Sequence, residues 1–254
     1  MLIKAAINGG RTKTEHPAVP VTPREQAAAV LECLNVGANA IHLHVRATSG
    51  LESLDAEDLA QTFAAVRSAA PHAQVGVSTG AWILNDTALR FEATSSWEIF
   101  PDFASVNFGE HGSVELADLL LSRGVGVEAG LCDEGAAQIF VNSGRAGDCF
   151  RVLIEPQQQD MAEALNTVDR IERVLESGAI MVPRLLHGTE ATSWPMMREA
   201  LKRDYAVRIG LEDTLVLPDG RIARDNTELV SEAVRLIKAA GSSQEQSVGE
   251  GSST

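Results

Sequence analysis

Two histidines and an arginine alternate with apolar residues in one short segment, Ala40-Ile41-His42-Leu43-His44-Val45-Arg46. Side chains of a β-strand point alternately to its two faces, so His42, His44 and Arg46 share one face and the apolar residues share the other. Two imidazoles at positions i and i+2 can converge on one metal ion. The pattern therefore indicates a metal site. It leaves open the alternative that both histidines are hydrogen-bonded core residues.

A second segment near the carboxyl end, Arg208-Ile209-Gly210-Leu211-Glu212-Asp213, could supply a third ligand. Alternation along a strand separates Arg208 and Glu212 from its apolar residues, which we expect to face surrounding helices. With Glu212, the two histidines would make the ligand count of a catalytic zinc site, which keeps one position open. Other divalent metals suit the same ligand types. The alternative is a buried ion pair between Arg208 and the two acids.

The chain alternates short apolar runs with longer amphipathic stretches, as expected for strands that are each followed by a helix. Thr22, Pro23 and Glu25 give the first helix a capping residue, a proline and an acid at its start. Eight strand-then-helix units in 254 residues predict a (β/α)8 TIM barrel, an α/β fold of about 250 residues. A doubly wound open sheet is the alternative. The predicted strands cover residues 2–7, 40–46, 74–78, 103–107, 125–129, 151–154, 179–186 and 207–211, and the predicted helices cover residues 22–36, 55–66, 86–90, 114–121, 134–141, 161–175, 191–203 and 226–239.

The composition is that of an ordinary globular protein, with 44% hydrophobic and 22% charged residues. A net charge of −14 argues against nucleic acid as a partner. No apolar run approaches the roughly 18 residues of a membrane helix, so no membrane partner is expected. Three widely spaced cysteines predict neither a disulfide framework nor a cysteine zinc site, which favours a cytoplasmic location. Residues 1–240 are predicted to form the single barrel domain and residues 241–254 a disordered tail.

In such barrels the reacting groups lie at the carboxyl ends of the strands and in the loops that follow. Two further predicted strands end in polar or small residues, which makes these residues candidates for substrate binding. A simple strand-ending turn is the alternative for Ser78, Thr79 and Gly80. His187, which follows another predicted strand, is explained equally well by a turn before a helix cap. The candidates are Ser78, Thr79 and Gly80 after one strand and Ser105 and Asn107 at the end of the next.

Taken together, these segments resemble the β-keto acid cleavage enzyme family, metal-dependent TIM barrels typified by 3-keto-5-aminohexanoate cleavage enzyme. The resemblance is collinear over residues 2–239, and its combination of motifs is specific. The matching stretches are residues 15–23, 42–46, 78–80, 104–109, 207–213, 217–220 and 225–230.

The resemblance implies a site and a reaction. It implies that His42, His44 and Glu212 hold zinc and that three further residues, Ser78, Arg208 and Asp213, are catalytic. The implied reaction is a Claisen-type exchange in which a β-keto acid and acetyl-CoA give acetoacetate and the CoA thioester of the remaining acyl group. Such an exchange needs a base, and Asp213 is suitable because it lies beside a metal ligand. Arg208 would be the cation that orients this base, and Ser78 would be the hydrogen-bond donor. Ser105 or Asn107 could position the thioester carbonyl.

The chain also departs from the family pattern. Members that act on amino-bearing keto acids have an acid just after the first strand, where this chain has Gly10 and Arg11, so we expect a neutral or anionic substrate. The alternative is that Arg11 pairs with Glu15 or faces solvent. Residues 141–190 match least, so the resemblance assigns no CoA contacts there. Arg46 is a candidate substrate-binding cation or a member of a rim ion pair.

Three alternatives for the whole chain follow from these patterns. The first is the β-keto acid cleavage enzyme, which we expect to be a homo-oligomer like most barrels of that family. The second is another metal-dependent barrel, an amidohydrolase or a class II aldolase, although an amidohydrolase usually carries its His-x-His pair on the first strand. The third is a barrel that binds an acyl-CoA or a metabolite without catalysis.

Overall fold

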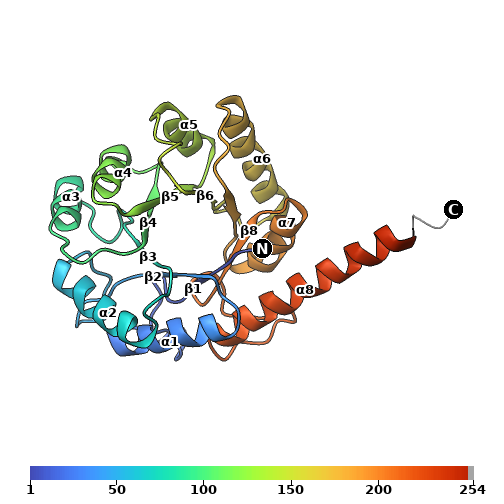
Figure 1. Cartoon of the computed structure of the whole chain (residues 1–254), viewed down its shortest axis with the longest axis horizontal. Coiled ribbons are helices and arrows are strands. Elements are labelled where there is room, and N and C mark those ends of the chain that lie inside the picture. Colours follow the sequence, from blue (N-terminus) through green and yellow to red (C-terminus); the bar gives the residue numbers. More distant parts are fainter. Residues whose placement is uncertain (251–254) are drawn as a thin grey trace.

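Eight parallel strands pair in chain order and close into a barrel, because β8 pairs with β1 (Figure 1). The helices lie around the outside of this barrel (Figure 1). The predicted (β/α)8 fold is therefore confirmed. The computed structural model describes the backbone of residues 1–250 and the side chains of residues 1–241. The strands are β1 (Ile3–Ala6), β2 (Ala40–Leu43), β3 (Val75–Ser78), β4 (Phe103–Asn107), β5 (Gly126–Leu131), β6 (Arg151–Ile154), β7 (Arg184–Leu186) and β8 (Ala206–Ile209). The helices are α1 (Pro23–Asn35), α2 (Ala56–Ala69), α3 (Thr87–Ser95), α4 (Ser113–Ser122), α5 (Glu134–Asn142), α6 (Met161–Ser177), a 3-10 turn η1 (Glu190–Thr192), α7 (Ser193–Lys202) and α8 (Asn226–Glu250).

Helix starts follow the local sequence. Thr22 accepts a hydrogen bond from the backbone N–H of Glu25, whose side chain accepts one from the backbone N–H of Thr22, so the predicted capping box is present. Asp55 caps α2 through the backbone N–H of Glu57. The local signals predicted in the sequence therefore fix where these helices begin.

Several strands are shorter than predicted. The strand predicted over residues 40–46 ends at Leu43, so His44 and Arg46 follow β2 and do not lie within it. The strand predicted over residues 179–186 is reduced to Arg184–Leu186, because Ala179 closes α6 in a left-handed conformation with φ of 52°. The strand predicted over residues 207–211 ends at Ile209. The carbonyl of Gly210 accepts the backbone N–H groups of Asp213 and Thr214, which turns the chain. This turn brings the acids that follow β8 back over the barrel.

The barrel has an apolar outer layer and a charged interior. Residues such as Ile41 and Leu43 pack between the strands and the helices. Inside the barrel, Lys4 of β1 pairs with Glu128 of β5, and Nε of Arg151 in β6 lies 2.6 Å from the same carboxylate. All three side chains are buried. Burying three charges is tolerable only because each has an opposite partner at hydrogen-bond distance.

Helix α8 continues to Glu250 and projects beyond the barrel (Figure 1). The tail was predicted to begin at residue 241, but extending an existing helix adds a backbone hydrogen bond per residue without requiring burial. Residues 251–254 of that predicted tail lie outside the described residues. Within the described part of the chain, no helix is long and apolar enough to cross a membrane.

Candidate metal centre and active site

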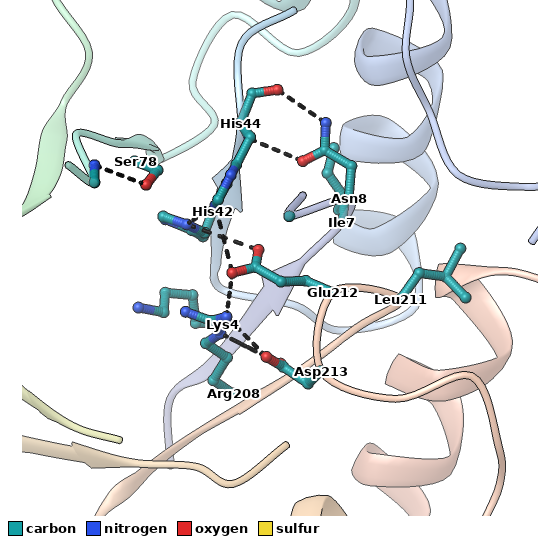
Figure 2. Close-up of polar contacts among 12 residues, drawn as sticks. Lys4, Ile7, Asn8, His42, His44, Ser78, Arg208, Leu211, Glu212 and Asp213 are labelled. Atoms are coloured by element: carbon teal, nitrogen blue, oxygen red, sulfur yellow. Dashed lines mark hydrogen bonds and ion pairs between the residues drawn. The ribbon is translucent and has the colours of Figure 1, made fainter. Parts of the chain in front are cut away.

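His42, His44 and Glu212 point toward one another at the carboxyl end of the barrel (Figure 2). The Nε2 atoms of the two histidines are 3.1 Å apart. Glu212 Oε2 lies 3.7 Å from His42 Nε2, and Glu212 Oε1 lies 3.4 Å from His44 Nε2. One ligand atom from each residue can be chosen so that all three lie within 4.8 Å of one another. The structure thus brings the predicted ligand set together.

Asn8 fixes the position of His44 just beyond the end of β2. The side-chain oxygen of Asn8 accepts the backbone N–H of His44 at 2.8 Å, and its amide donates to the carbonyl of His44 at 2.9 Å. Gln26 of α1 donates to the same carbonyl at 2.9 Å. One asparagine side chain therefore continues the pairing of β1 and β2 by a further residue and holds the second histidine above the first.

Two glycines leave room for Glu212. A Cβ on Gly210 would lie 2.0 Å from the carbonyl oxygen of Ala6, so only glycine lets β8 end this close to β1. A Cβ on Gly9, which has φ of +54°, would lie 2.3 Å from Cγ of Glu212. Asn226 joins the same strand ends, since it accepts from the backbone N–H of Leu211 and donates to the carbonyl of Ile7, both at 2.8 Å.

Burial and neighbouring charges give the three groups different protonation preferences. Burial holds the pKa of His42 well below its usual 6.5 against the attraction of Glu212. Burial alone would also lower the pKa of His44, but the carboxylates of Glu212 and Glu52 outweigh it and raise the pKa to about 9. Burial would raise the pKa of Glu212, yet Arg208 and the two histidines hold it well below 4.5. Glu212 is thus ionised, and His42 is a neutral imidazole.

These residues fit a divalent cation. Glu212 Oε2 is buried and has no hydrogen-bond partner among the described residues. A buried carboxylate oxygen without a partner is costly, and a cation held by the three side chains would satisfy it. Two imidazoles and one carboxylate form a donor set of catalytic zinc sites, and binding a cation requires that His44 release its proton.

Arg208 and Asp213 lie next to this cluster (Figure 2). Nη2 of Arg208 lies 2.8 Å from Oδ1 of Asp213 and also donates to Glu212. Burial would lower the pKa of Arg208, but these two carboxylates raise it above its usual value. Asp213 has no exposed surface, and its Oδ1 lies 3.4 Å from Nδ1 of His187. Asp213, the predicted base, is therefore covered by the side chains of Arg208 and His187.

A cavity of about 410 Å³ opens beside the cluster. A cavity of about 780 Å³ lies at the opposite end of the strands, lined by Leu2 and Arg151 among others, where no predicted site residue is found. We call the smaller cavity, which is lined by Arg208 and Glu212, the pocket; its binding of substrate stays a prediction. Its remaining lining residues are Trp82, Asn107, Gly109, Glu110, Cys132, Asp133, Glu155, Gln157, His187 and Thr189.

The other predicted site residues occupy the ends of β3 and β4. Ser78 is buried, and its hydroxyl accepts the backbone N–H of Gly80 at 3.3 Å. The Thr79 hydroxyl donates to the carbonyl of Ser105 at 2.7 Å, which joins the two strand ends. Asn107 lines the pocket and donates to Glu110 at 2.8 Å. The catalytic role of Ser78 and the substrate-binding role of Thr79, Gly80, Ser105 and Asn107 stay predictions.

The two candidate arginines bind the protein itself. Arg46 is buried and donates to the carbonyls of Gly9 and Arg11, the latter at 3.0 Å, and to that of Gly50 at 3.2 Å. It thereby holds the loop after β1. The guanidinium of Arg11 pairs with Glu190, in addition to a contact of 3.4 Å with Glu15. A role in substrate binding stays a prediction for both arginines.

Three residues near the site were not assigned from the sequence. Glu52 accepts a hydrogen bond from Nδ1 of His44, and Glu155 lies 3.5 Å from Nε2 of His187. His187 is buried between Glu155 and Asp213. His187 and Glu155 each carried a signal in the sequence, since each directly follows a strand, β7 and β6. Glu52 follows the turn at Gly50, and nothing local in the sequence connects it to a histidine eight residues earlier.

The fold and this cluster define a (β/α)8-barrel protein with a candidate metal centre at the carboxyl ends of β2 and β8. The model of the beta-keto acid cleavage enzyme family matches residues 1–176 and 150–246, and the chain belongs to that family. The resemblance inferred from the motifs is therefore confirmed, and the chain is an enzyme that cleaves β-keto acids with transfer of an acyl group.

Curated relatives align over nearly the whole chain. The 3-keto-5-aminohexanoate cleavage enzyme of Fusobacterium nucleatum subsp. nucleatum is 29% identical, over 95% of this chain and 92% of the relative. The 3-oxoadipate:acetyl-CoA acetyltransferase of Cupriavidus necator is 26% identical, over 94% and 89%. The solved apo structure of ObcA is similar in fold, with a TM-score of 0.70 and 17% identity. That match covers 89% of this chain, which spans 63% of the length of ObcA.

Proposed function

We propose that this enzyme exchanges acyl groups between a β-keto acid with an uncharged side chain and acetyl-CoA, giving acetoacetate and a new acyl-CoA. The observation that carries the proposal is the convergence of His42, His44 and Glu212 beside the pocket-lining Arg208. The family membership supplies the reaction class, and the acetyltransferase from Cupriavidus necator is a relative whose name includes acetyl-CoA.

In this proposal the three ligands hold zinc or another divalent cation. When bound, such a cation supplies a Lewis acid that polarises the substrate carbonyl and offsets the negative charge that develops on the substrate. Arg208 orients Asp213, which is the proposed base, and keeps it beside the ligand Glu212. Because Arg208 and His187 cover Asp213, one of them must move for the substrate to reach it directly. The O–H of Ser78 is the proposed hydrogen-bond donor, since its contact with Gly80 uses only the oxygen as acceptor.

The residues that line the pocket support the proposal that the thioester binds against the loops after β6 and β7. Gln157 and Thr189 line the pocket from these loops. Gln159 donates to the hydroxyl of Thr189 at 3.1 Å, which joins the two loops. Asn107 faces the same pocket from β4 and could donate to the thioester carbonyl. We therefore place the CoA thioester between these loops and Asn107.

Charge pairing in and near the pocket supports an uncharged substrate side chain. Arg11 is paired with Glu190 and Glu15, so its charge is already compensated. Within the pocket, Glu155 lies 3.5 Å from His187, whose pKa is raised because the carboxylates facing it outweigh burial and Arg208. A cationic or an anionic side chain would compete with these pairs, whereas a neutral one leaves them intact.

A direct test supplies the zinc-loaded protein with acetyl-CoA and a panel of neutral, anionic and amino-bearing β-keto acids, and measures acetoacetate. We expect turnover that is fastest with neutral members. Glu212→Gln is the matched control, because it preserves shape and removes the charge. Absence of acetoacetate with every member would overturn the proposal, and a clear preference for amino-bearing or anionic substrates would overturn the charge assignment.

Assays with further substrates and without CoA separate the remaining alternatives. Hydrolysis of an amide or a lactone without CoA would indicate an amidohydrolase-like barrel, and aldol cleavage without CoA a class II aldolase. Tight binding of an acyl-CoA without turnover would indicate a binding barrel. The family match favours the cleavage enzyme over all three.

A further inference from the structure

Glu52 lies outside the strands that carry the metal ligands, yet its carboxylate contacts one of them. It follows a turn at Gly50 in the loop between β2 and α2, and an antiparallel bridge pairs its backbone with that of Arg46. This loop folds back on the end of β2, so that Oε1 of Glu52 accepts a hydrogen bond from Nδ1 of His44. The side chains of His44 and Glu52 are only 4% and 15% exposed, which separates this pair from an ordinary surface ion pair.

Trp82 holds the same carboxylate from the other side. Its indole Nε1 donates to Oε1 of Glu52 at 3.1 Å. The indole ring also stacks on the imidazole of His44, with ring centroids 6.1 Å apart and an interplanar angle of 27°. The ring occupies the space beside Gly80, where a Cβ would lie 2.2 Å from it. Trp82 also lines the pocket, so one side chain joins the pocket wall to the contact of Glu52 with His44.

These contacts decide which nitrogen of His44 can bind a cation. A carboxylate only accepts hydrogen bonds when ionised, so Nδ1 of His44 must carry a proton to bond Glu52. In the neutral ring this leaves the lone pair on Nε2, the atom that faces His42 and Glu212. Two donors on one oxygen, from an imidazole and an indole, also restrict the rotamers of Glu52.

We propose that Glu52 and Trp82 are positioning residues for the metal ligand His44. Glu52 holds the imidazole as the Nδ1–H tautomer with Nε2 directed into the cluster, and Trp82 holds Glu52 in that position. The inference rests on the proposed function, because it requires that the cluster binds a cation. Carboxylates that accept the second N–H of a metal-bound histidine typically contribute about 10-fold to 100-fold in metal affinity.

The test measures zinc affinity of the full-length protein by competition with a chelator, together with the visible absorption spectrum of the Co²⁺-loaded protein. Glu52→Ala should weaken zinc binding by about 10-fold to 100-fold and change the Co²⁺ spectrum. Glu52→Gln should weaken it less, because the amide oxygen still accepts from Nδ1. Trp82→Phe keeps the stacked ring, loses one hydrogen bond, and should weaken zinc binding by about twofold to fivefold. Glu57→Ala is the matched control, an exposed acid of α2 whose side chain accepts from Gln61.

Two outcomes would be decisive. A folded Glu52→Ala protein that keeps the wild-type zinc affinity and Co²⁺ spectrum would overturn this inference. If that variant does not fold, Glu52→Leu decides by the same comparison, because leucine fills much of the same space and has no atom that accepts from Nδ1. Zinc binding by His42→Ala that equals that of the wild type would instead overturn the metal centre of the proposed function, so the two failures are distinguishable.

Discussion

Nη2 of Arg208 lies 2.8 Å from Oδ1 of Asp213, and the same nitrogen donates to Glu212. One guanidinium group therefore connects the proposed base to a proposed metal ligand. Asp213 also accepts from Nε of Arg208 at 3.1 Å, so the pair has the two-point geometry that a planar guanidinium provides. A change in the shape of this cation should therefore affect both partners at once.

Replacing Arg208 by lysine should preserve the charge and lose this geometry. An ammonium group cannot make the parallel contacts of a guanidinium, so we expect kcat to fall by about 10-fold or more while the protein stays folded. Arg208→Ala should also destabilise the fold by about 3–5 kcal/mol, because it leaves Asp213 buried without its cation. Steady-state kinetics and urea denaturation measure the two effects. Wild-type kcat in Arg208→Lys would refute the two-point role.

Removing one proposed ligand should abolish metal binding and activity together. Glu212→Gln keeps the side-chain shape, and an amide is a poorer ligand for zinc than a carboxylate. Loss of a Lewis acid that contributes several kcal/mol predicts a decrease of about 1,000-fold in kcat/KM. Metal content after dialysis and kcat/KM with and without added zinc provide the readout. Treatment of the wild-type protein with a chelator should reproduce the loss, and zinc should restore activity only in the wild type.

A methyl group at Gly210 should strain the closure of the barrel. Its Cβ would lie 2.0 Å from the carbonyl oxygen of Ala6, a backbone atom that cannot move away alone. Overpacking of this kind costs about 1–3 kcal/mol, so Gly210→Ala should lower the free energy of unfolding by that amount. Gly147→Ala is the matched control, because no heavy atom lies within 4 Å of its Cβ position. Equal stability of the two variants in denaturant titrations would contradict the close approach of β8 and β1.

Glu128 should make the barrel sensitive to acid. Burial would raise the pKa of Glu128, but Lys4 and Arg151 outweigh burial and hold it well below 4.5. The unfolded chain then binds more protons than the folded one below about pH 5, so the stabilisation present above that pH is lost as the pH falls. We expect Glu128→Gln to be less stable at pH 7 and to lose less stability between pH 5 and pH 3. Denaturant titrations across this range test it, and parallel curves for the two proteins would exclude the effect.

Freeing Arg11 should shift the substrate preference toward anionic keto acids. The partner carboxylate of Glu190 is about half exposed, so the pair is a partly solvated one. The interaction free energy of such a pair is about 0.2–1 kcal/mol. Glu190→Gln should therefore change the ratio of kcat/KM for anionic and neutral substrates by a few-fold. Glu57→Gln, an exposed acid on α2, should leave the ratio unchanged. An unchanged ratio in Glu190→Gln would indicate that Arg11 does not face the substrate.

The sequence by itself determined the barrel and the identity of the candidate ligands. Alternation along a strand is local, so the face of the segment around His42 could be read directly, and the capping box at Thr22 fixed the start of α1. Glu212 was identified as a ligand by its residue type and place after β8, although it lies in the turn beyond the strand. The parallel strands of a closed barrel all present their carboxyl ends at one edge. This geometry predicted that ligands 170 positions apart would meet, as the distances now show.

Only the tertiary structure decided how the loops complete the site. The partners of Arg46 and Arg11 are backbone carbonyls and a distant glutamate, and no periodicity in the sequence selects them. The contact of Glu52 with His44 depends on how one turn folds back, and the approach of Asp213 to Arg208 depends on the turn after Gly210. Loop residues lack the hydrophobic periodicity that identifies a strand or a helix in the sequence. Their conformations are therefore set by how they pack against the barrel.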